Sequence, residues 1–74
     1  MDKDTVTLNG HIGANIQRIR KEHGLSHAQL AETVGISQYI LQDVEEGNER
    51  VTVALVDALT VALGVGYSDF LEGV

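Results

Sequence analysis

Three histidines, His11, His23 and His27, are the side chains of this sequence best suited to metal or acid–base chemistry. Protein zinc sites combine neutral imidazole with thiolate or carboxylate ligands. His23 and His27 have the spacing of neighbours on one helix face, but Gly24 between them is expected to end a helix. The chain has no cysteine, which removes thiolate ligands and disulfides. We therefore expect no metal site.

The residue patterns of catalysis are also missing. The sequence contains no nucleophile–base pairing and no glycine-rich phosphate loop, and its 74 residues form one domain too small for a substrate cleft. The first ten residues lack the apolar segment of a signal peptide. The apolar stretch 51–66 is too short and too polar to span a bilayer. We expect a cytoplasmic binding protein without cofactor, membrane contact or small-molecule substrate, and not an enzyme.

The elements that would position polar side chains are short helices separated by glycines. Residues 1–9 are expected to form an N-terminal arm, because residues 5–8 alternate polar and apolar as in an extended segment or short strand. Residues 10–23 are expected to be helical, because apolar residues recur at spacings of four and three. These residues are Leu8, Ile12, Ile16 and Ile19.

Capping residues mark the later helices. Ser26 and Gln29 form a capping box for a second helix that ends at Gly35, and Ser37 caps a third that runs to about residue 46. Thr52 caps a fourth helix over residues 53–63, and residues 68–71 form a short fifth. The expected inward-facing residues of the second, third and fourth helices are Leu30, Ala31, Val34, Leu41, Val44, Val53, Val56, Leu59 and Leu63. The pattern predicts an all-α fold.

Two short helices joined by a tight glycine turn suggest a helix-turn-helix, and the detailed residues carry a closer resemblance. The segments concerned are Ile19-Arg20, Gly24-Leu25-Ser26, Gln29-Leu30-Ala31, Val34-Gly35-Ile36-Ser37, Leu41, Val44-Glu45-Glu46-Gly47, Leu59, Leu63-Gly64-Val65 and Phe70-Leu71. Together they closely resemble the phage repressor and Cro-like (XRE-type) helix-turn-helix family. The resemblance covers residues 12–71. It implies a compact five-helix lambda-repressor-like DNA-binding domain over residues 10–74.

The resemblance also implies roles for particular residues. Arg20 and Glu45 match a partly buried salt bridge that joins the first helix to the third in the family. The third helix matches the recognition helix, whose exposed face enters the major groove of DNA. The candidate base-reading residues on this face are Gln38, Tyr39, Ile40, Gln42 and Asp43.

Phosphate contacts are expected beside the recognition helix, from side chains and from backbone N–H groups at helix N-termini. The candidates are Arg18, Lys21, Ser26, His27, Gln29, Ser37, Asn48 and Arg50. The net charge of −6 conflicts with the basic surface usual in DNA-binding domains. Glu46 and Glu49 stand where the family often has Lys or Arg, and Val51 replaces its usual proline.

The fourth helix carries more apolar residues than one inward face requires. A surface helix normally has a polar outer face, although scattered exposed apolar residues are common. Either the helix has such an ordinary surface, or it forms a homodimer or partner interface. The candidate interface residues are Leu55, Ala58, Val61, Ala62, Val65, Tyr67 and Phe70, with Val74 as an extension.

Two functions follow from these patterns. The first is a homodimeric transcriptional regulator on a palindromic operator: a phage-type repressor, a restriction–modification controller or an antitoxin. The alternative is a protein-interaction module on a helix-turn-helix scaffold, such as an anti-repressor or partner-binding subunit. A positive recognition face favours the first, and an acidic face favours the second.

Overall fold

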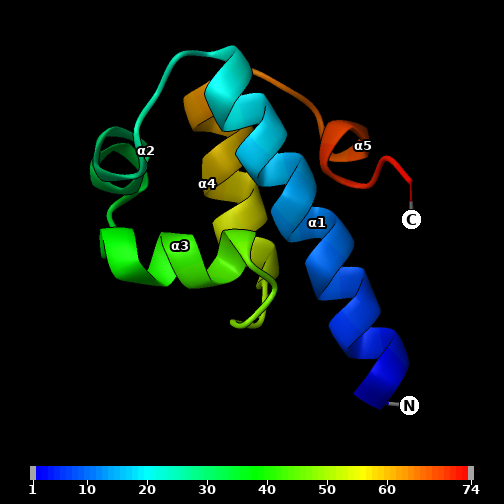
Figure 1. Cartoon of the computed structure of the whole chain (residues 1–74). Helices are drawn as coiled ribbons and strands as arrows, with labels where there is room; N and C mark the ends of the chain where they lie inside the picture. Colours follow the sequence, from blue (N-terminus) through cyan, green and yellow to red (C-terminus); the bar gives the residue numbers. More distant parts are fainter. Residues whose placement is uncertain (1, 74) are drawn as a thin grey trace.

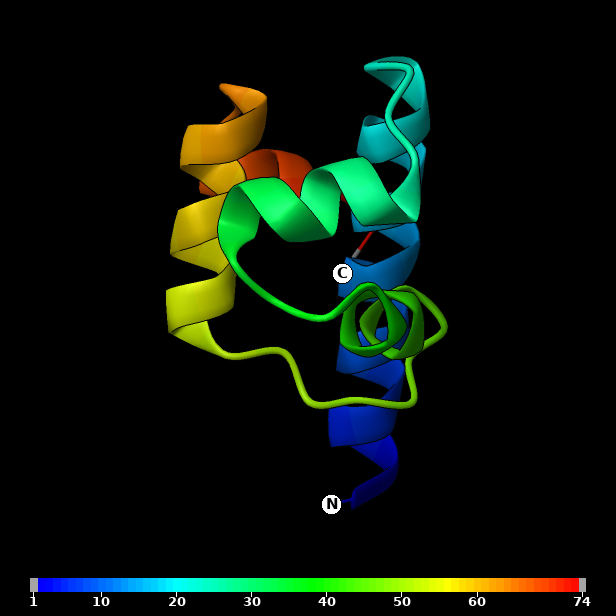
Figure 2. The ribbon, with the colours of Figure 1, turned by 90° about the vertical axis from the view of Figure 1, so that its left-hand side faces the viewer.

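The computed structural model describes residues 2–73, with side chains from residue 10 onward. The described part is all-helical, with five helices in chain order: α1 (Asp2–Glu22), α2 (His27–Val34), α3 (Gln38–Glu45), α4 (Val53–Leu63) and α5 (Tyr67–Phe70). In Figure 1, α2 and α3 lie on one side of α1 and α5 lies on the other. Turned by 90°, the molecule shows α2 passing between α1 and α4 (Figure 2).

The predicted capping residues begin the helices as expected. Ser26 Oγ accepts a hydrogen bond from the Gln29 backbone N–H at 3.1 Å, and Gln29 Oε1 accepts one from the Ser26 N–H at 2.8 Å. Ser37 and Thr52 cap α3 and α4 through their hydroxyls. Gly35 ends α2 with φ +79°, a backbone conformation that glycine adopts without steric cost. These local interactions set the short α2–α3 connection.

The core gathers apolar side chains from all five helices. Phe70, Ile16, Leu30, Leu41, Leu59 and Val44 are its largest fully buried members. Ile12, Ile19, Ala31 and Leu63 complete it, and Val34 and Val56 pack against it from partly buried positions. The predicted inward faces of α2 and α3 are therefore confirmed. Leu8, predicted for the same face of α1, lies outside the residues with described side chains.

Gly13 allows α1 and α3 to approach closely. A Cβ atom at Gly13 would overlap the backbone oxygen of Val44 and lie 2.9 Å from that of Glu45. Backbone oxygens cannot move aside as a flexible side chain can, so this crossing requires glycine. This role could not be predicted, because an isolated glycine within a helix reveals nothing of what packs against it.

Three sequence predictions need correction. Residues 2–9 are helical and continue α1, where an extended arm or short strand was predicted; the polar–apolar alternation covered only four residues and did not outweigh propagation of the helix. Val53, predicted for the core, is 73% exposed because it is the first residue of α4. Phe70, predicted for an interface, is fully buried because α5 packs on α1.

None of the helices in residues 2–73 combines the length and apolar character needed to cross a membrane.

Candidate nucleic-acid interface

α3 presents a continuous face of polar and apolar side chains to solvent. All five predicted base-reading residues are exposed: Gln38, Tyr39, Ile40, Gln42 and Asp43. Tyr39 is 69% and Ile40 is 46% exposed, although both are large and partly apolar. None of the five side chains makes a hydrogen bond or ion pair with another described residue. The face is therefore unoccupied within the monomer and available to a ligand.

The opposite face of α3 is fixed by a buried ion pair. Arg20 Nε and Nη2 donate to the two carboxylate oxygens of Glu45 at 2.7 and 3.1 Å, and Arg20 Nη1 donates to the Leu25 carbonyl at 2.7 Å. The side chains are only 6% and 1% exposed. This two-pronged geometry orients both groups as well as pairing their charges. It joins α1 to the C-terminal end of α3, as the resemblance implied.

His27 extends this pair towards the surface. Its Nε2 lies 2.9 Å from Glu45 Oε1, and the His27 side chain is 32% exposed. His27 was predicted only as a phosphate contact. Its contact with Glu45 was missed because the two residues are 18 positions apart and only the tertiary fold brings them together.

The remaining phosphate candidates differ in whether their side chains already make hydrogen bonds within the protein. Ser26, Gln29 and Ser37 already use side-chain oxygens as helix caps, although each hydroxyl or amide retains a donor. Asn48 Nδ2 donates weakly to Glu46 Oε1 at 3.4 Å. Lys21 and Arg50 are exposed. Apart from Lys21 in the last turn of α1, the residues of this set lie at the N-termini of α2 and α3 and in the loop after α3.

Arg18 does not belong with this group. It pairs with Glu22 at 3.5 Å and with Glu72 at 3.1 Å, and it also contacts the Asp69 carbonyl. These contacts place it against the α5 side of α1, away from α2 and α3 (Figure 1). These contacts turn Arg18 towards the C-terminal segment and do not favour its predicted phosphate contact, which stays a prediction.

The positive charge available near α3 is consequently small. Among residues with described side chains, Lys21 and Arg50 are the two Lys or Arg residues without an ion pair. Asp43, Glu46 and Glu49 are exposed on or just after α3. Sparse cations and neighbouring carboxylates oppose phosphate binding, so any attraction must draw on backbone N–H groups and hydrogen bonds.

A second exposed surface lies over α4 and α5. Val61 is 83% exposed, and Tyr67 and Leu71 are about half exposed at 49% and 47%. Four of the other predicted interface residues, Leu55, Ala58, Ala62 and Val65, are half-buried. Leu55, Ala62 and Val65 pack against the core and offer only their edges to a partner.

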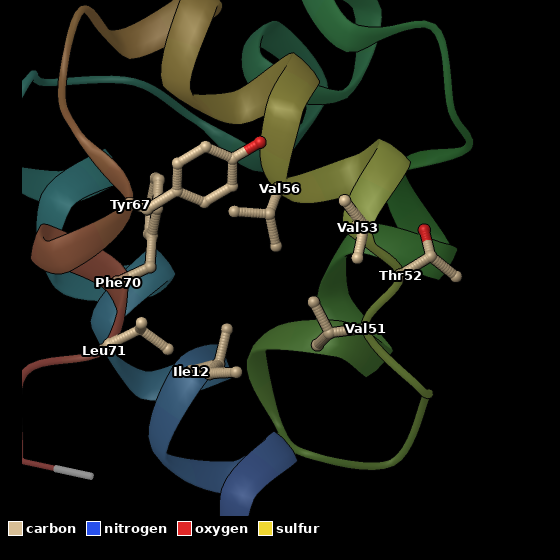
Figure 3. Close-up of a pocket in the computed structure, with 8 residues that line it drawn as sticks. All are labelled: Ile12, Val51, Thr52, Val53, Val56, Tyr67, Phe70 and Leu71. Atoms are coloured by element: carbon tan, nitrogen blue, oxygen red, sulfur yellow. The ribbon is translucent and has the colours of Figure 1, made fainter.

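An apolar groove of about 210 Å³ opens beside this surface (Figure 3). It lies between α1, the start of α4 and α5, and it is lined by Ile12, Val51, Thr52, Val53, Val56, Tyr67, Phe70 and Leu71. Only two of these residues, Tyr67 and Phe70, were predicted from the sequence as interface residues. The others were missed because α1 and the loop before α4 meet α5 only in the folded chain.

The chain is similar to an antitoxin, to a phage repressor and to a gene regulator. A family model described as a helix-turn-helix domain matches residues 11–70. Antitoxin PezA of Streptococcus pneumoniae is 37% identical over 60 residues, which cover 81% of this chain and 38% of PezA. The immunity repressor protein of Bacillus phage phi105 is 35% identical over 57 residues, which cover 77% of this chain and 40% of the repressor. The chain thus spans about two fifths of each relative.

A solved structure agrees over most of the fold. The crystal structure of the clp gene regulator ClgR from C. glutamicum superimposes with a TM-score of 0.83 at 30% identity, covering 86% of this chain and 82% of that one. The family match over residues 11–70 includes the capped α2–α3 unit. With the family model covering residues 11–70, the chain belongs to the helix-turn-helix domain family of DNA-binding transcriptional regulators.

Proposed function

We propose that this chain acts in the cytoplasm as a homodimer that binds a palindromic DNA operator and regulates transcription from it. The observation that carries the proposal is the outward face of α3, whose five exposed side chains make no hydrogen bond or ion pair with other described residues. In a dimer, two copies of α3 would enter successive major grooves about 34 Å apart on one side of the duplex. The similarity to a phage immunity repressor favours repression.

Each outward side chain of α3 fits a feature of the major groove. Gln38 and Gln42 can each make paired hydrogen bonds to an adenine edge, and Ile40 can pack on a thymine methyl group. Tyr39 can donate to a phosphate or pack against the groove wall. Asp43 can accept from cytosine N4–H₂, and it disfavours placement beside a phosphate. The set predicts an operator half-site that contains A·T pairs.

Phosphate contacts in this proposal come from groups around the start of α2 and α3. Ser26, Gln29 and Ser37 offer hydroxyl and amide donors, and Asn48, Arg50 and Lys21 add donors nearby. Backbone N–H groups at the first turn of a helix carry partial positive charge. These neutral donors support docking where Lys and Arg are few.

Dimerisation in this proposal uses α4 and α5. Val61 is mostly exposed, and Tyr67 and Leu71 border the apolar groove. Burying such side chains between two copies removes apolar surface from water, at about 25 cal/mol per Å² before the costs of association. A small domain gains stability as well as binding geometry from such an interface.

The decisive experiment is a selection of duplexes from a random pool by the purified chain at low salt. The proposal predicts an enriched motif with two inverted half-sites about one helical turn apart. The Gln38→Ala/Gln42→Ala double variant is the control, and it should lose the motif while keeping its fold by circular dichroism. Recovery of no motif by the folded wild-type chain would contradict the DNA-binding proposal.

A second candidate function is a protein-interaction module on the same scaffold, an anti-repressor or partner-binding subunit. Two observations favour it. Arg18 and Arg20 are both held in ion pairs, which leaves an acidic chain with few free cations, and an apolar groove lies open beside α5. This candidate becomes the better account if the duplex selection fails.

A further inference from the structure

His27 lies where the buried ion pair reaches the surface on the α2–α3 side. Its Nε2 lies 2.9 Å from Glu45 Oε1, and Arg20 Nη2 donates to the same oxygen at 3.1 Å. Glu45 is almost fully buried, whereas 32% of the His27 side chain is exposed. The ring therefore has one nitrogen committed to the protein interior and enough exposure for the other to meet a ligand.

The partner of Nε2 determines which protonation state can bind a phosphate. A carboxylate only accepts hydrogen bonds, so the single proton of a neutral His27 ring belongs on Nε2. Nδ1 then presents a lone pair, which repels a phosphate oxygen, and no described residue bonds to Nδ1. The doubly protonated ring instead donates from Nε2 to Glu45 and from Nδ1 outwards, where the bond to a phosphate is charge-assisted.

The charges around the ring leave a phosphate as its natural counter-ion. Glu45 from α3 touches the ring, but Arg20 from α1 already neutralises that carboxylate. The other charged residues on or beside α2 and on the helices packed against it are Glu32, Asp43, Glu46 and Asp57, all exposed. None of these four makes a hydrogen bond or ion pair with the ring in the described structure. An added phosphate would supply the unmatched negative charge.

We infer that His27 is a proton-dependent phosphate contact, so that DNA binding takes up a proton at His27 and affinity rises as the pH falls. Histidine suits this role because it changes charge between about pH 5 and 8. The inference rests on the DNA-binding function proposed above and adds its dependence on pH. Lys21 and Arg50 are the unpaired basic residues with described side chains, so one further cation per subunit matters.

The test measures the dissociation constant for a fluorescent duplex carrying the selected motif, at pH 6.0 and 7.5 and constant ionic strength. For each proton taken up on binding, the affinity changes by at most about tenfold per pH unit. Wild-type affinity should be several-fold higher at pH 6.0, and mixing in weak buffer at pH 6.5 should consume protons. His27→Gln, whose amide can still donate to Glu45, should show a smaller pH response and less proton uptake.

Three further variants make the result specific. His11→Gln and His23→Gln should keep the wild-type pH response, and His27→Lys should bind at pH 7.5 about as tightly as at pH 6.0. An equal pH response in wild type and His27→Gln overturns this inference while leaving the DNA-binding proposal intact. If His27→Gln does not fold, absence of proton uptake by the wild type overturns it. Failure of wild type to bind duplex at either pH overturns both proposals.

Discussion

Glu45 is the residue on which the geometry of α3 most depends. It accepts from two nitrogens of Arg20 and from His27 while being 1% exposed. Removing one member of a buried ion pair leaves the other charged and without a partner, which costs more than the pair contributes relative to apolar residues. The stability of the domain should therefore respond unequally to single and paired substitutions here.

Arg20→Ala should lower the free energy of unfolding by about 3 kcal/mol, because it leaves the Glu45 carboxylate buried with only His27 as a partner. Denaturation in urea measures the change. The double variant Arg20→Met/Glu45→Leu removes both charges, and its free energy of unfolding should fall clearly less than that of Arg20→Ala. A single variant within about 0.5 kcal/mol of the wild type would mean that the pair behaves as a surface contact.

Gln38→Ala should weaken binding to the selected duplex by about 1–3 kcal/mol, because paired hydrogen bonds to one base are lost. The loss should fall on the selected motif and not on a scrambled duplex, as measured by fluorescence anisotropy. Gln17→Ala on α1, outside the α3 face, is the control and should change neither. Equal weakening by both variants would contradict a base-reading role for Gln38.

At the scale of the element, the features that could be predicted from the sequence are those set by residues close together in the chain. The caps at Ser26, Ser37 and Thr52 and the left-handed Gly35 depend on residues within a few positions, so the bounds of α2, α3 and α4 could be predicted closely. The family resemblance placed the Arg20–Glu45 pair. The pairing of Arg18 with Glu72 and the close approach at Gly13 depend on packing between distant segments, and no local pattern encodes them.

The α1–α3 crossing gives a matched pair of substitutions. Gly13→Ala should destabilise the fold by roughly 1–3 kcal/mol, because the new methyl group overlaps the Val44 backbone oxygen and forces the helices apart. Gly10→Ala, one turn earlier, meets nothing within 4 Å and should be neutral or stabilising by up to about 1 kcal/mol. Thermal unfolding measures both. Similar effects at the two positions would contradict a close crossing at Gly13.

At the scale of the whole molecule, opposite sides of α1 carry different features. In Figure 1, α2 and α3 lie on one side of α1 and α5 lies on the other. The exposed face belongs to α3, the Arg18 ion pairs lie on the α5 side, and the apolar groove lies between α1, the start of α4 and α5. A dimer joined through α4 and α5 would leave both α3 faces exposed. The net charge of −6 acts over the entire assembly and weakens its attraction to nucleic acid.

The dependence of DNA affinity on salt concentration should reflect the small number of Lys and Arg side chains near α3. With Lys21 and Arg50 in each of two subunits, the slope of log affinity against log salt should be shallow, roughly −2 to −4, at about −0.9 per neutralised phosphate. Glu49→Lys should raise affinity for every duplex and steepen the slope. Glu72→Lys makes the same charge change on the α5 side and should affect the slope less. A wild-type slope near −8 would contradict this charge count.

Val61→Glu should yield monomers in analytical ultracentrifugation, because a carboxylate would be buried at the proposed interface without a partner. Val61 is 83% exposed in the single chain, so helical circular dichroism should remain intact. Tyr39→Glu places the same charge on α3 and should leave the dimer unchanged. A wild-type chain that sediments as a monomer at high concentration would contradict α4–α5 dimerisation.

The five outward side chains of α3 make no hydrogen bonds or ion pairs with the described remainder of the chain, while Leu41, Val44 and Glu45 hold the helix from beneath. Substitutions among the five therefore carry little penalty in folding. Under the proposed function, mutations on this face would change the operator preference while the scaffold stays constant. The same separation makes a library randomised at residues 38, 39, 40, 42 and 43 a practical starting point for retargeting the domain to new DNA sequences.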